Sequence, residues 1–266
     1  RLALKDPSLL KTAFGKSWYN NYMRISSDAG KVLKANTEEA FNEGYSAFFG
    51  NGPGSFVWDS WANLWGTGFT DEAEFIKDKS FRRSVWNEVV EDADRHNEPG
   101  KFTAFSGYEW TPDLDPAAYH RVVIFKDSAE KVTQILPFAY HDSSDPEKLW
   151  EFLSGYEQNV GGEAFAIPHN GNLTSGLMFS FLDFNGNPIN IDYAKTRSRW
   201  EPLYEVTQIK GDGETHPVLS PNDEFADYET WNSWAGWTME GVDTEGWEKR
   251  KQHEYARSAL KLGLLQ

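Results

Sequence analysis

Four side chains that commonly bind metal ions stand at the ends of apolar, strand-like runs in this 266-residue sequence. Glu109 closes one run, His120 opens the next, and His169 closes a third, while His216 lies in the polar stretch that follows a fourth. Imidazole and carboxylate groups are the ligands of zinc, manganese and iron hydrolases, in which the metal lowers the pKa of a bound water to roughly 7. The first three residues therefore form a candidate ligand set, with His216 in reserve.

Taken singly, each residue has an ordinary structural interpretation. A lone histidine such as His169 is most often buried and satisfied by the backbone. Phe165, Ile167 and His169 are spaced by two, however, so in a strand they share one face, and Pro168 marks the strand's end because it has no N–H to donate. Polar side chains at such strand ends build the active sites of α/β barrels. Three strand ends of this kind favour a site over three unrelated residues.

The elements expected around these residues alternate between helix and strand. A loop over 111–118 should return the chain as a hairpin, which would make Glu109 and His120 neighbours. Helical spacing predicts a helix over about 81–96, and Asp145 followed by a proline predicts the start of another. This alternation is typical of an α/β fold with helices outside a mostly parallel sheet.

The remaining segments are predicted from weaker patterns. A helix is expected from Asp6 to about Ile25, an irregular stretch from Asn172 to Trp200, a strand over 203–209, and a final amphipathic helix from Trp247 whose His253 faces solvent. Tryptophan-rich loops are expected at 56–65 and 231–237. They could pack on the body of the protein or grip a carbohydrate or aromatic ligand.

Composition narrows the classes of function. A formal net charge of -15 repels phosphate backbones and argues against a broad nucleic-acid surface. The absence of cysteine rules out disulfides and thiolate chemistry. No run approaches the ~20 apolar residues of a membrane span, which predicts a soluble chain and leaves its compartment, cytoplasmic, periplasmic or secreted, open. No serine-hydrolase elbow or P-loop occurs, whereas a pair of glycosidase carboxylates remains open because nothing singles out two acids.

Four motifs resemble those of a known family. They surround the candidate residues and are the segments 105–111 (FSGYEWT), 120–125 (HRVVIF), 166–172 (AIPHNGN) and 205–217 (EVTQIKGDGETHP). Together they are similar to the DUF3604 branch of the PHP (polymerase and histidinol phosphatase) superfamily, and the similarity runs from about Asp6 to the end. The resemblance implies one domain over 1–266 with a distorted TIM-like α/β barrel and long irregular loops.

The same resemblance implies a centre of two or three divalent metal ions, Zn, Mn or Fe. Glu109 matches the superfamily's metal-bridging acid, and His120 and His169 match single imidazole ligands; Glu109 and His169 would carry the catalysis. The superfamily's H-x-H strand, its Asp-His pair and its late Asp-x-His have no counterpart between Arg1 and Gln266. The chain is therefore expected to be the middle portion of a longer protein, with a barrel incomplete at both ends that missing segments or another chain would complete.

The function expected on this basis is metal-dependent hydrolysis of a small anionic ester, a phosphate in preference to a sulfate. Asn170, Arg199, Lys210 and His216 would line the substrate side. Two alternatives are a non-catalytic module that binds a carbohydrate or aromatic ligand, and a fragment without activity of its own.

Overall fold

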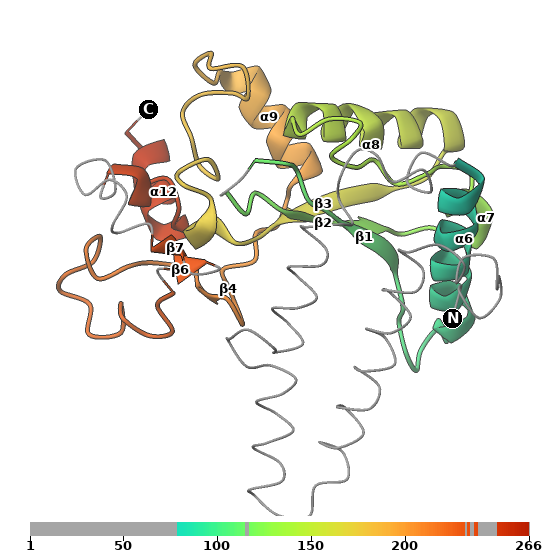
Figure 1. Ribbon diagram of the computed structural model, residues 1–266, viewed down its shortest axis with the longest axis horizontal. Helices are drawn as coiled ribbons and strands as arrows, with labels where there is room; N and C mark the ends of the chain where they lie inside the picture. Colours follow the sequence, from blue (N-terminus) through green and yellow to red (C-terminus); the bar gives the residue numbers. More distant parts are fainter. Residues whose placement is uncertain (1–78, 115–116, 232, 235–236, 239–248, 266) are drawn as a thin grey trace, which may run out of the picture. The chain divides into compact units, whose positions relative to one another are not determined.

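The structure is a computed structural model that describes residues 79–114, 117–231, 233–234, 237–238 and 249–265 (Figure 1). The chain divides into two compact units, Arg1–Val85 and Trp86–Gln266, and the second contains the sheet and the candidate site. The helix expected over 6–25 and the loop at 56–65 lie outside the described residues. A single domain over 1–266 stays a prediction.

The central sheet has three strands in the order β1-β2-β3, and both neighbouring pairs are antiparallel. The strands are β1 (Ser106–Trp110), β2 (Arg121–Phe125) and β3 (Ala164–Pro168). Glu109 faces Val122 across the first pair, and Val122 faces Ile167 across the second. The hairpin predicted around 111–118 is thereby confirmed.

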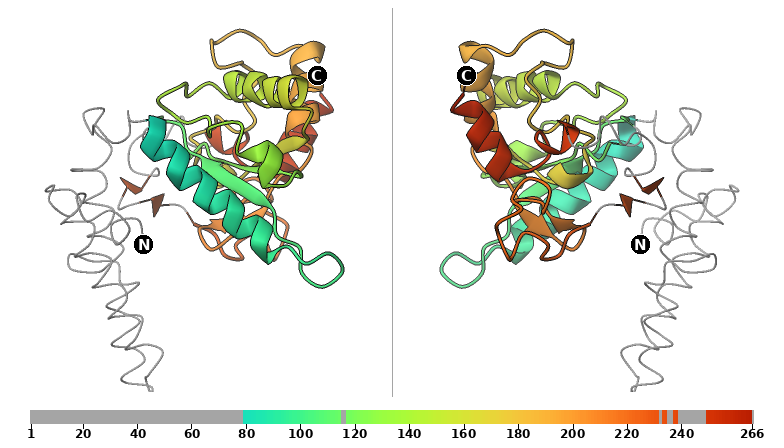
Figure 2. Two further views of the ribbon diagram at one scale, coloured as in Figure 1. Left: turned by 90° about the vertical axis from the view of Figure 1, so that its right-hand side faces the viewer. Right: turned by 90° about the vertical axis from the view of Figure 1, so that its left-hand side faces the viewer.

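One face of the sheet is covered by helices. In Figure 1, α8 (Pro146–Val160) and α9 (Ile191–Trp200) lie above the strands, and Figure 2 shows α6 (Lys79–His96) running alongside β1. The core between these layers consists of Trp86, Val90, Trp110, Val123, Phe125, Val132, Leu149, Trp150, Leu153, Tyr156, Ala164, Ala166 and Trp200. Burying each large side chain in this layer stabilises the fold by about 1.5–3 kcal/mol.

The antiparallel sheet differs from the mostly parallel sheet that the sequence predicted. Between β2 and β3, α7 (Ala129–Val132) is followed by the irregular stretch 133–145 before α8 begins. Lys126 N–H donates to the Glu163 carbonyl (3.0 Å) at one end of the sheet, whereas Asp113 N–H donates to Ser144 Oγ (3.0 Å) at the other. The chain thus crosses the sheet twice between the strands, and β3 starts where β2 ended. A barrel stays a prediction.

The start of α8 follows the prediction. Asp145 is its N-cap, and the carboxylate accepts a hydrogen bond from Glu147 N–H (2.9 Å), while Pro146 occupies the first helical position. The helix ends at Gly161, which takes a left-handed conformation with φ 70°. Both ends of this helix thus carry local capping interactions.

The region after β3 holds more helix and less strand than predicted. Helix α9 replaces part of the expected irregular stretch; its N-cap Asn190 accepts from Asp192 and Tyr193 N–H, but only Trp200 is buried, so hydrophobic periodicity missed it. The strand expected over 203–209 shrinks to β4 (Thr207–Gln208), paired with β5 (Gly211–Asp212). Nothing apolar is buried there to define a longer strand, because Val206 and Ile209 are exposed.

The C-terminal prediction of an exposed His253 is wrong. His253 Nδ1 lies 2.9 Å from the Phe179 carbonyl, and the imidazole packs edge-on to Phe181. Helix α12 (Ala256–Gly263) begins only after this residue, so His253 sits in a turn rather than on the helical face assumed from the spacing. The described part of the 231–237 loop contains two short strands, β6 (Ser233–Trp234) and β7 (Trp237–Thr238). No helix within the described residues has both the length and the apolarity to cross a membrane.

Candidate metal centre

The pleat of the sheet sends two sets of side chains to opposite faces. Arg121, Val123 and Phe125 of β2 are buried under the helices. His120 therefore shares the other face with Val122. Glu109 is directly opposite Val122 in the register and points the same way. His169 follows β3 with the parity of Ile167, as predicted, so all three candidate ligands lie on the face away from the helices.

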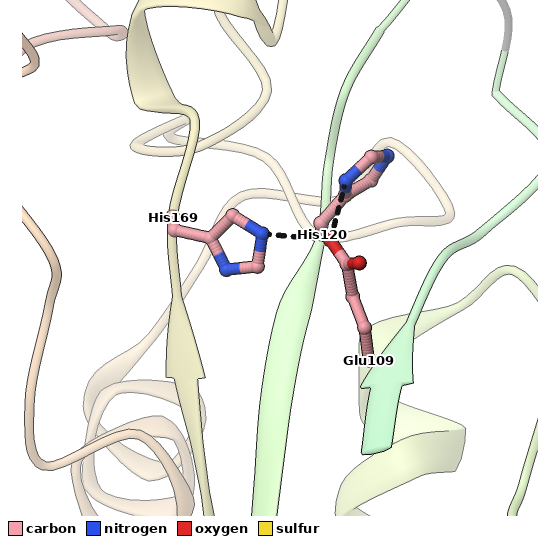
Figure 3. A group of neighbouring side chains, drawn as sticks. All are labelled: Glu109, His120 and His169. Carbon is pink, nitrogen blue, oxygen red and sulfur yellow. Dashed lines mark hydrogen bonds and ion pairs between the residues drawn. The ribbon is translucent and has the colours of Figure 1, made fainter. Parts of the chain in front are cut away.

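At the edge where β1 ends and β2 begins, these three side chains meet (Figure 3). Glu109 Oε1 lies 3.0 Å from His120 Nδ1 and 2.9 Å from His169 Nε2. The two imidazole rings are 5.7 Å apart and nearly perpendicular. One ligand atom from each residue falls within 4.8 Å of the others, and this is the sole group of its kind among the described residues.

The environment favours the protonation states that a metal ion needs. Hydrogen bonds from His120 and His169 hold the pKa of Glu109 well below its usual range, so the group is a carboxylate at neutral pH. Burial lowers the pKa of His120, although the hydrogen bond with Glu109 opposes that shift. A neutral imidazole and an ionised carboxylate are the forms that coordinate a cation.

The donor set fits a divalent cation. Zinc is bound by histidine nitrogens and carboxylate oxygens at about 2.0–2.2 Å, so the ligand atoms around one ion lie about 3–4 Å apart. The separations of 2.9 and 3.0 Å around Glu109 approach that spacing already. His169 Nε2 is the ring nitrogen that faces Glu109. The other nitrogen, Nδ1, is buried with no hydrogen-bond partner among the described residues. Glu109, His120 and His169 would hold the ion.

Asn170 and Lys210, two of the residues predicted to line the substrate side, border this group. Asn170 is 2% exposed, and its Nδ2 lies 3.3 Å from His120 Nδ1. Burial lowers the pKa of Lys210, while the charges of Glu109 and Glu205 act to raise it. The Lys210 ammonium is thus close enough to Glu109 for the two charges to interact.

The other two predicted substrate residues are engaged elsewhere. Arg199 Nη2 donates to both carboxylate oxygens of Glu157 in α8 (2.6 and 2.8 Å), and its guanidinium lies over the Trp200 ring. His216 is 4% exposed, its Nδ1 accepts from Val218 N–H (3.3 Å), and it is not a member of the ligand group. The structure gives Arg199 a visible role in joining α8 to α9.

Sequence reasoning missed one residue beside the site. Gln208 donates from Nε2 to Asn170 Oδ1 over 2.6 Å. A lone glutamine in a short polar strand carries no spacing signal. The one available clue was its place two residues before Lys210 in the motif 205–217.

Comparison with known families supports the resemblance carried by the four motifs. The family model described as "Protein of unknown function (DUF3604)" matches residues 20–266. The chain belongs to the DUF3604 family. Searches of curated proteins and of solved structures found no match. The resemblance to DUF3604 is confirmed. Membership of the PHP superfamily stays a prediction.

Proposed function

We propose that this DUF3604 protein is a metal-dependent hydrolase of a small anionic ester, with a phosphoester preferred to a sulfate ester. The observation that carries the proposal is the convergence of Glu109, His120 and His169 from three strand ends onto one point. Membership of the PHP superfamily, with two or three Zn, Mn or Fe ions in the complete protein, is part of the same proposal.

Each side chain at the site has a role in the proposed hydrolysis. Glu109 and His169 are the catalytic ligands, and His120 completes the set. A divalent ion held there would supply a hydroxide nucleophile at neutral pH and polarise the ester. Lys210 contributes a positive charge beside Glu109, which favours an anionic substrate over a neutral one. Asn170 offers an amide at the same edge.

Metal analysis of the full-length protein tests the proposal. His169→Ala should lower the affinity for Mn²⁺ or Zn²⁺ by roughly tenfold or more and abolish turnover of p-nitrophenyl phosphate. His96→Ala is the matched control, because His96 is exposed at the end of α6 and contacts only the Asp92 carbonyl among the hydrogen bonds found. Unchanged metal content in His169→Ala would overturn the proposed site. Faster turnover of p-nitrophenyl sulfate than of the phosphate would overturn the preferred substrate class.

A further inference from the structure

The Asn170 amide can present two opposite chemistries to the metal group. Its Nδ2 donates hydrogen bonds and suits an anion, whereas its Oδ1 could coordinate a divalent cation. The two orientations have nearly the same shape, so the hydrogen-bond partners decide between them. What faces the site therefore depends on what holds the far side of the amide.

Gln208 occupies that far side. Its Nε2 donates to Asn170 Oδ1 at 2.6 Å, and in this orientation Nδ2 of Asn170 faces His120. Asn170 is 2% exposed, so solvent offers no alternative partner for the oxygen. Losing this buried hydrogen bond would leave Oδ1 unsatisfied and favour its rotation toward a cation.

When the site holds a cation, His120 Nδ1 does not accept a hydrogen bond from Asn170 Nδ2. The same Nδ1 lies 3.0 Å from Glu109 Oε1, and a single ring nitrogen cannot donate to a carboxylate or bind a cation while accepting from an amide. When Nδ1 binds a cation, Nδ2 remains a donor beside the metal group. A bound anion can then accept from it.

The β4–β5 hairpin brings Gln208 to this position. Gln208 pairs with Gly211 across the hairpin, and Lys210 belongs to the turn between them. Asn172 Nδ2 donates to the Lys210 carbonyl (3.0 Å), which ties the turn to the segment directly after Asn170. One hairpin thus supplies both the charge of Lys210 and the partner of Asn170.

We propose that Gln208 is a positioning residue that makes Asn170 a hydrogen-bond donor to the anionic group of the substrate, and prevents it from acting as a metal ligand. The inference rests on the proposed function, because it takes the metal site as given. It predicts that the anionic group binds on the side of the metal centre that Asn170 and Lys210 border.

Calorimetric titration of the Mn²⁺-loaded full-length protein with inorganic phosphate tests the inference without requiring turnover. Gln208→Leu and Asn170→Gly should each weaken phosphate binding roughly tenfold or more, the scale of a hydrogen bond to a charged group. The double variant should bind phosphate like Asn170→Gly alone, because Gln208 acts only through Asn170. Thr207→Ala, an exposed neighbour on β4, should bind phosphate like the wild type.

Metal affinity separates this inference from the proposed function. Gln208→Leu should keep its Mn²⁺ affinity within about threefold or tighten it, whereas Gln208→Glu, which cannot donate to Oδ1, should tighten Mn²⁺ and weaken phosphate. Gln208→Glu also serves if the leucine variant fails to fold. Unchanged phosphate affinity in both Gln208 variants, or a full extra loss in the double variant, would overturn the role of Gln208 alone. Absence of Mn²⁺ binding by the wild type would overturn the proposed function and this inference together.

Discussion

Asn170 has a left-handed backbone, with φ 62° and ψ 31°, where the chain leaves β3 and turns into the 3₁₀ helix Gly171–Leu173. Asparagine tolerates this conformation better than other residues with a Cβ, and glycine tolerates it best. The residue that places an amide beside His120 therefore also permits the turn. The same residue thus serves the backbone turn and places the amide beside His120.

Two substitutions separate these roles. Asn170→Ala and Asn170→Gly remove the same side-chain hydrogen bonds, but only alanine has a Cβ atom that makes the left-handed conformation unfavourable. We expect Asn170→Ala to be less stable than Asn170→Gly by about 1 kcal/mol, measured by urea unfolding of the two variants. Equal stabilities would show that the turn relaxes to a negative φ when the amide is removed.

The positions of the three candidate ligands were predictable because their signal is local. A period of two put His169 on the face of Ile167, and a hairpin brought Glu109 beside His120, and both expectations are confirmed. Arg199 and Gln208 were not predictable in the same way. Their contacts cross 42 and 38 positions of sequence, to Glu157 and Asn170, and no periodicity encodes such pairings.

At the scale of elements, a buried ion cluster joins β2 to the helices. Arg121 Nε donates to Glu201 Oε1 and Arg197 Nε to Oε2, each over 3.0 Å, and Trp150 Nε1 also donates to Oε1. The side chains of Arg121 and Glu201 are 0% and 1% exposed. The carboxylate directly after α9 therefore connects that helix to α8 and to the strand that follows His120.

Neutralising this carboxylate should be costly. Glu201→Gln leaves two guanidinium groups without their counter-charge in the interior, so we expect a loss of about 3–5 kcal/mol in the free energy of unfolding. Glu157→Gln is the matched control, because it breaks the pair with the exposed Arg199, a contact worth about 0–1 kcal/mol. Chemical denaturation of both variants measures the difference. Equal losses would mean that the buried cluster adds no more than a surface pair.

The same cluster predicts a pH dependence. Burial by itself would raise the pKa of Glu201, but the charges and hydrogen bonds of Arg121 and Arg197 lower it overall. A lowered carboxyl pKa gives stability that is complete above the unfolded value, about 4.3, and is lost as the pH falls through the folded pKa. The stability gap between wild type and Glu201→Gln should stay constant from pH 7 to about 5 and narrow below pH 4. A gap that widens in acid would contradict the assignment.

On the scale of the whole molecule, a metal ion bound at this centre would tie the ends of all three strands. Mn²⁺ at 100 times its Kd should stabilise the full-length protein by about 2.7 kcal/mol, or roughly 5–10 °C in Tm. A chelator should reverse the shift, and His169→Ala, at the same Mn²⁺ concentration, should show about half of it or less. Differential scanning fluorimetry measures all three, and an equal shift in the variant would place the ion elsewhere.

The fold was less predictable than the site. Capping residues predicted the start of α8, but the direction of β3 depends on the irregular stretch 133–145, whose path follows from tertiary hydrogen bonds such as that of Ser144. Helix α9 buries too little apolar surface to leave a periodic pattern. Sequence reasoning therefore succeeded where the determinant is local and failed where a distant contact sets the path.

The alternation of faces in β1, β2 and β3 constrains how this protein can change length. Adding or deleting one residue within β2 would carry His120 toward the helices and bring Arg121 out of its buried cluster, and so lose the site and the core at once. Changes of two residues would keep each side chain on its own face. Viable length variation in homologous strands should therefore come in pairs.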